Sequence, residues 1–129
     1  MDGAIAKLVS VAFGGAVGSV ARYLINISPV QQFHGRFPAS TFLINVTGSF
    51  LIGFLLVLFT SRFPHNEALR LLVLVGFLGA FTTFSTFELE IWGLIEKHRY
   101  LVAFTYLFLS VFVGFIGVVL GIALGRKCC

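Results

Sequence analysis

Four stretches of this chain are apolar, nearly uncharged and long enough to cross a lipid bilayer as a helix, which takes roughly 20 residues. They lie at about residues 5–27, 38–61, 69–95 and 100–125. Only 11% of the residues are charged, against about a quarter in a soluble domain, so the chain lacks the polar surface that water requires. The sequence therefore predicts an all-α integral membrane protein whose residues 1–129 form a single domain of four transmembrane helices.

The links between these stretches are short, so consecutive helices should be antiparallel neighbours with both termini on one side of the membrane. The basic residues then divide almost equally between the two sides: Lys7, Arg62, Arg70, Arg126 and Lys127 against Arg22, Arg36, Lys97 and Arg99. Because an excess of Lys and Arg normally marks the cytoplasmic side, two outcomes stay open. The chain inserts with a weak bias and cytoplasmic termini, or it inserts both ways and forms an antiparallel, dual-topology homodimer.

The distribution of the basic residues along the chain also indicates which partners the protein can bind. These residues are scattered between apolar blocks and form no stripe that would follow a phosphate backbone, so we expect no nucleic acid partner. Their places beside the spans suit the anionic headgroups of a lipid bilayer. We therefore expect a multi-pass protein of the cell's inner (plasma) membrane.

Small residues recur at intervals of four in three of the spans. The pairs and series are Gly14 and Gly18, Ser49 and Gly53, and Gly117, Gly121 and Gly125. Such residues let the backbones of membrane helices approach closely. They predict a tightly packed bundle.

The third span departs from a plain apolar helix. Residues 76–87 hold two glycines and four Ser or Thr residues at the middle depth of the membrane. Hydroxyl side chains can take over freed backbone groups, and non-helical backbone at this depth needs surrounding protein or water. We predict a break over Gly79–Thr83. The alternative is an unbroken helix whose hydroxyls bond to the preceding turn.

A break would create groups that bind ions, because unwound carbonyls hold cations and helix ends attract anions. Phe77, Phe81, Phe84 and Phe87 recur at steps of four, three and three, so we expect them to share one helix face. The edge of a phenyl ring is positive. Such edges can line the path of an anion without a full charge that would trap it.

Polar residues in the other spans are further candidates for this path, each with an ordinary structural alternative. Asn45 offers two N–H donors or an interhelical hydrogen bond. Arg22 is an anion-collecting vestibule residue or a snorkelling anchor. Glu90 is a vestibule group or a solvated charge, and Ser110 with Tyr106 gives the last span a thin polar line. No nucleophile, base and orienting acid can be assembled, so we do not expect an enzyme.

Residues 79–87, with the sequence GAFTTFSTF, resemble the signature of the Fluc (CrcB) fluoride channel family. Gly14–Tyr23, Thr41, Asn45–Gly48 and Glu90 are also similar to that family, and the resemblance covers essentially the whole chain. It implies a dual-topology homodimer that passively exports cytoplasmic fluoride and so lowers its toxicity. One departure is Gly79-Ala80-Phe81, where the commonest family pattern has Gly-Gly-Leu; Ala80 would be strained if its φ had to be positive.

The resemblance also implies roles for individual residues. Asn45, Phe84 and Phe87 match pore-lining residues, Ser110 and Tyr106 match a polar track, and Thr41 belongs to the same path. A structural sodium ion at the dimer centre would be held by the backbone carbonyls of Gly79 and Thr82. Carbonyl oxygens suit such a hard cation.

Two other functions fit the size and the number of spans. A small dual-topology cation or drug exporter needs an acidic residue in its first helix, and none occurs between Gly3 and Asn26. A non-conducting membrane scaffold would explain the small-residue repeats. It leaves Asn45 and the interrupted third span without a purpose.

Overall fold

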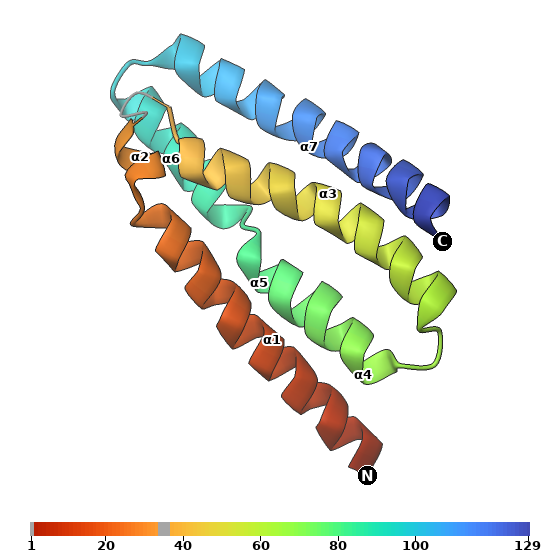
Figure 1. Ribbon diagram of the computed structural model, residues 1–129. Coiled ribbons are helices and arrows are strands. Elements are labelled where there is room, and N and C mark those ends of the chain that lie inside the picture. Colours follow the sequence, from red (N-terminus) through yellow and green to blue (C-terminus); the bar gives the residue numbers. More distant parts are fainter. Residues whose placement is uncertain (1, 34–36) are drawn as a thin grey trace.

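The computed structural model describes residues 2–33 and 37–129, in which every regular element is helical (Figure 1). Three spans are continuous helices: α1 (Asp2–Asn26), α3 (Ala39–Arg62) and α7 (Tyr100–Cys128). The third span comprises α4 (Glu67–Arg70), η1 (Leu71–Leu78), α5 (Gly79–Phe81) and α6 (Ser85–Glu96). All four are long and apolar enough to cross a bilayer. The predicted all-α fold with four transmembrane helices is confirmed, with ends within a few residues of those expected.

The first connection contains a short helix, α2 (Pro29–Phe33), that the sequence analysis did not predict. Pro29 stands at its first position, where a missing N–H costs no helical hydrogen bond. Arg36, counted above among the basic residues, lies outside the described residues.

The helices pack as two close pairs, in which α1 lies along η1 and α5, and α3 lies along α7 (Figure 1). Glycines permit both contacts. A Cβ added to Gly18 would overlap the carbonyl group of Phe77, and one added to Gly121 would overlap the carbonyl oxygen of Phe50. The small-residue repeats therefore act as close-packing surfaces between backbones.

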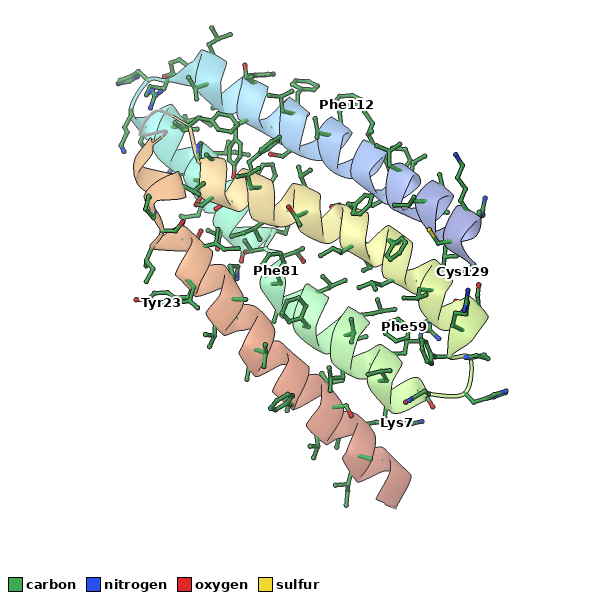
Figure 2. All side chains as sticks on the ribbon, in the orientation of Figure 1. Lys7, Tyr23, Phe59, Phe81, Phe112 and Cys129 are labelled. Carbon is green, nitrogen blue, oxygen red and sulfur yellow. The ribbon has the colours of Figure 1, made fainter. Side chains whose placement is uncertain are left out.

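Two apolar clusters lie between these pairs. One includes Phe59 on α3 and Phe81 on α5. The other contains Phe87 and Tyr106, near the α6 end of the bundle. Large apolar side chains such as Phe112 point outward from the bundle, as a lipid-facing surface requires (Figure 2). The protein is a multi-pass membrane protein, which in bacteria places it in the plasma membrane.

The third span is helical up to Phe81 and again from Ser85, with Thr82 extended at φ −76° and ψ 156°. The expectation that non-helical backbone begins at Gly79 is wrong, because Gly79 is right-handed helical at φ −62° and ψ −35°. Glycine permits a break without enforcing one, whereas β-branched Thr82 suits extended backbone. Ala80 lies within α5 and does not have a positive φ, so it is unstrained.

Candidate functional site: a polar pocket beside the interrupted span

Asn45 on α3 bonds to the backbone at the interruption. Its Nδ2 donates to the carbonyl oxygen of Thr83 at 2.9 Å, and the Thr83 N–H donates to its Oδ1 at 2.8 Å. Thr83 is buried, and its peptide groups have left the helical hydrogen-bond ladder. The side chain thus satisfies groups that would otherwise be costly in an apolar setting. One N–H of Asn45 remains to act as a donor.

The two threonines at the interruption stabilise the helix ends on either side. Thr82 Oγ1 donates to the carbonyl oxygen of Leu78 at 2.9 Å, on the last turn before the break. Thr83 Oγ1 accepts from the N–H of Thr86 at 3.3 Å, so it caps the start of α6. The pair explains why the chain can leave and re-enter the helix within three residues.

A pocket of about 310 Å³ adjoins the interruption. It brings together six of the residues predicted from the sequence to form the ion path or cation site: Asn45, Gly79, Thr82, Phe84, Phe87 and Ser110. They come from α3, the third span and α7. Tertiary packing therefore assembles one chamber from residues up to 65 positions apart in the chain.

Phe84 and Phe87 both line the pocket, with ring centroids 6.0 Å apart, but their surroundings differ. Phe87 is 5% exposed and its ring meets that of Tyr106 edge-on at 5.0 Å, whereas Phe84 is 71% exposed. Phe77 and Phe81 stack on each other at 5.6 Å and do not line the pocket. The predicted single face of four phenylalanines is therefore wrong, because the interruption changes the direction in which later residues point.

Glu90 forms a second polar cluster beside the pocket. Thr41 Oγ1 donates to its Oε1 and Tyr106 Oη donates to its Oε2, each at 2.7 Å. Both hydroxyl-bearing side chains are completely buried, and neither lines the pocket. The cluster joins α3, α6 and α7 at one point, and Glu90 is more than the solvated helix-end charge considered above.

Arg22 lies on α1 and is partly buried. In the described part of the chain its Nε is buried without a hydrogen-bond partner, and Arg22 makes no ion pair with Glu90. It does not line the pocket. The structure therefore does not bring Arg22 together with the other predicted site residues.

Two polar residues that line the pocket were not predicted from the sequence to belong to the ion path. Thr83 is the partner of Asn45, and Ser49 lines the pocket one helical turn beyond Asn45. Ser49 had been assigned to helix packing because it pairs with Gly53 in a small-residue repeat. The spacing of four residues between Asn45 and Ser49 could have indicated that Ser49 faces the same pocket, since residues four apart share a helix face.

The interruption also frees backbone oxygens. Among the described residues, no main-chain N–H donates to the carbonyl oxygen of Gly79 or Thr82. In a continuous helix the N–H groups of Thr83 and Thr86 would do so, but here they bond to the side chains of Asn45 and Thr83. Unpaired carbonyl oxygens are the donors that a hard cation prefers. The two residues implied by the family resemblance therefore fit such an ion.

The fold and the pocket define a class: a small four-span membrane protein with an interrupted helix beside a chamber of neutral donors and phenyl rings. Residues 9–122 match the family described as CrcB-like protein, Camphor Resistance (CrcB), and the chain belongs to that family.

Relatives named fluoride-specific ion channel FluC are similar along nearly their whole length. The Hydrogenobaculum protein is 47% identical over 117 residues, which are 91% of this chain and 95% of the relative. The Hahella chejuensis protein is 44% identical over 123 residues, 95% and 96% of the two chains. The Magnetococcus marinus protein is 46% identical over 121 residues, 93% and 98%.

Proposed function

We propose that this protein is a passive, fluoride-selective channel that releases cytoplasmic fluoride and so lowers its toxicity. The names of its relatives support this function, and so does the chemistry of the pocket. Because the relatives are named as ion channels, we propose no enzymatic role.

The observation that carries the proposal is the lining of the pocket by neutral donors and phenyl rings. Asn45 and Ser110 supply N–H and O–H groups, while Phe84 and Phe87 supply rings with positive edges. None of these groups carries a full charge. An anion can therefore be stripped of water and held without being trapped, which conduction requires. Fluoride, the smallest halide, makes the strongest hydrogen bonds of the series and gains most from such donors.

The active unit is proposed to be an antiparallel homodimer. The almost equal division of basic residues permits insertion in both orientations. Phe84, at 71% exposure, leaves one side of the chamber open in a single chain, and a second copy would cover it. A two-fold axis in the membrane plane would then give two equivalent chambers.

A sodium ion at the centre of that dimer would be held by the carbonyl oxygens of Gly79 and Thr82. When bound, it would supply a fixed positive charge that these carbonyl dipoles stabilise. The interruption is stabilised by the protein's own side chains. Asn45 and the hydroxyls of Thr82 and Thr83 form hydrogen bonds with backbone groups at and beside it.

Efflux from liposomes that contain the purified protein tests the function. We expect rapid loss of fluoride and negligible loss of chloride, followed with ion-selective electrodes. Equal leakage of the two halides, or none, would reject the channel and leave a non-conducting scaffold. Proton-coupled uptake of a cationic drug would instead favour the exporter.

Orientation needs a separate experiment. After replacement of Cys128 and Cys129, a single cysteine placed at Lys97 in the exposed turn between α6 and α7 serves as the reporter. The dimer predicts that an impermeant thiol reagent labels it from both sides of the membrane. Labelling from one side alone would contradict the antiparallel arrangement.

A further inference from the structure

One face of α3 and one face of α7 carry polar or small residues at matching intervals of four. They are Thr41, Asn45 and Ser49 on α3, and Tyr106, Ser110 and Gly114 on α7. Residues four apart share a helix face, and α3 packs along α7 (Figure 1). The first position on each helix bonds to Glu90, and the second lines the pocket. The series forms one polar seam between the two helices.

Ser49 and Gly114 meet at the third position of this seam. A Cβ added to Gly114 would stand 3.5 Å from Ser49 Oγ, an ordinary contact distance. The glycine therefore leaves open the space beside the hydroxyl. Ser49 also lines the same pocket as Asn45 and Ser110, so this residue lies at the chamber as well as at a packing surface.

The hydroxyls of Ser49 and Ser110 are free to donate. Hydroxyls on helices commonly bond to the carbonyl one turn earlier, as Ser10 and Thr60 do at 2.8 and 2.7 Å. Over residues 2–33 and 37–129, Ser110 Oγ is buried without a hydrogen-bond partner. Ser49 is partly buried and makes no such bond to the preceding turn, unlike Ser10 and Thr60. A buried hydroxyl without an acceptor is costly. A bound anion would remove that cost.

We propose that Ser49 is a further anion-binding residue, whose hydroxyl donates to fluoride together with Ser110, one helical turn beyond Asn45. This inference rests on the proposed function. A turn advances about 5.4 Å along the helix, so the ion can pass between neighbouring donors without leaving all of them at once. Several shallow sites allow faster passage than one deep site. Gly114 contributes by keeping the Ser49 hydroxyl accessible.

Fluoride efflux from liposomes distinguishes a donor role from a packing role. Ser49→Ala should slow efflux by about tenfold or more, because one hydrogen bond to an ion is worth at least that factor in an equilibrium constant. Ser49→Thr keeps the hydroxyl and should restore most of the rate, its methyl group taking the space beside Gly114. The matched control is Ser10→Ala on α1, whose hydroxyl already bonds to a backbone carbonyl, and it should match the wild type.

A packing role predicts the reverse order, with Ser49→Ala unchanged and the larger threonine slower. That order, or equal efflux rates for the wild type, Ser49→Ala and Ser49→Thr, would overturn the inference. Gel filtration of each variant shows whether it folds and assembles as the wild type does. A wild-type protein that fails to conduct fluoride would reject the proposed function itself. A conducting wild type with an unchanged Ser49→Ala variant would reject this inference alone.

Discussion

Asn45 and Thr83 exchange two hydrogen bonds, at 2.9 and 2.8 Å, across 38 positions of the chain. The amide side chain replaces a peptide group at the point where the third span leaves the helix. This single relationship connects α3 to the interruption, stabilises extended backbone in an apolar environment and places a donor at the pocket. Stability and conduction should therefore depend on the same side chain.

Replacement of Asn45 by leucine tests this link. We expect the free energy of unfolding to fall by about 2–6 kcal/mol, since two buried main-chain groups lose partners worth about 1–3 kcal/mol each. Denaturant titration in detergent micelles measures the change. Thr47→Val, an exposed position on the same helix, is the control and should stay within about 0.5 kcal/mol of the wild type. Similar stabilities for the two variants would contradict the role assigned to Asn45.

Tyr106→Phe isolates the hydroxyl that bonds to Glu90. The ring and its edge-on contact with Phe87 are kept, but one carboxylate oxygen loses its donor. We expect a loss of about 1.5–3 kcal/mol in unfolding free energy. In a Glu90→Leu background the same substitution should cost much less, because no acceptor remains. Equal costs in both backgrounds would show that the hydrogen bond is not the cause.

Two glycines should respond oppositely to alanine. A Cβ at Gly18 would overlap the backbone of Phe77, so Gly18→Ala should separate α1 from η1 and cost about 1–3 kcal/mol. Gly93 lies inside α6 with nothing near its added Cβ, and Gly93→Ala should stabilise the protein by about 0.5–1 kcal/mol. Thermal unfolding of both variants measures the difference. A shift in the same direction for the two would refute the close contact at Gly18.

Alanine substitutions at Phe84 and Phe87 should distinguish an effect on conduction from an effect on folding. Phe87→Ala removes a ring that is 5% exposed and should cost about 3–5 kcal/mol in stability. Phe84→Ala removes a ring that is 71% exposed, so the single chain should fold normally while fluoride efflux falls. Unfolding and efflux are measured on both variants. A strongly destabilised Phe84→Ala chain in monomeric form would contradict the exposure seen here.

The turn after α6 offers a test of backbone strain. His98 has φ 55°, and its N–H and that of Arg99 bond to the carbonyl oxygens of Ile95 and Leu94. This is the usual left-handed end of a helix, where glycine avoids a penalty of about 1 kcal/mol. His98→Gly should therefore raise thermal stability modestly, whereas His98→Ala should not. A lower melting temperature for the glycine variant would contradict this account.

The sequence was sufficient to predict the spans, because the length and apolarity of a membrane helix are local properties. It also pointed to residues 79–83 as unusual, since the Gly and Thr residues that weaken a helix lie there. It did not locate the extended residue, because Gly79 permits both helix and break. The hydrogen bonds that stabilise the interruption come from Asn45, which lies 38 positions before Thr83 in the chain.

Tertiary structure alone decided which side chains share the chamber. Phe77 and Phe81 belong to the same series of phenylalanines as Phe84 and Phe87, yet only the second pair lines the pocket. Ser49 reads as a packing residue until Gly114 is seen beside it. Such contacts depend on how one helix lies against another. No property of a single helix contains that information, whereas its tendency to cross the membrane is set by its own residues.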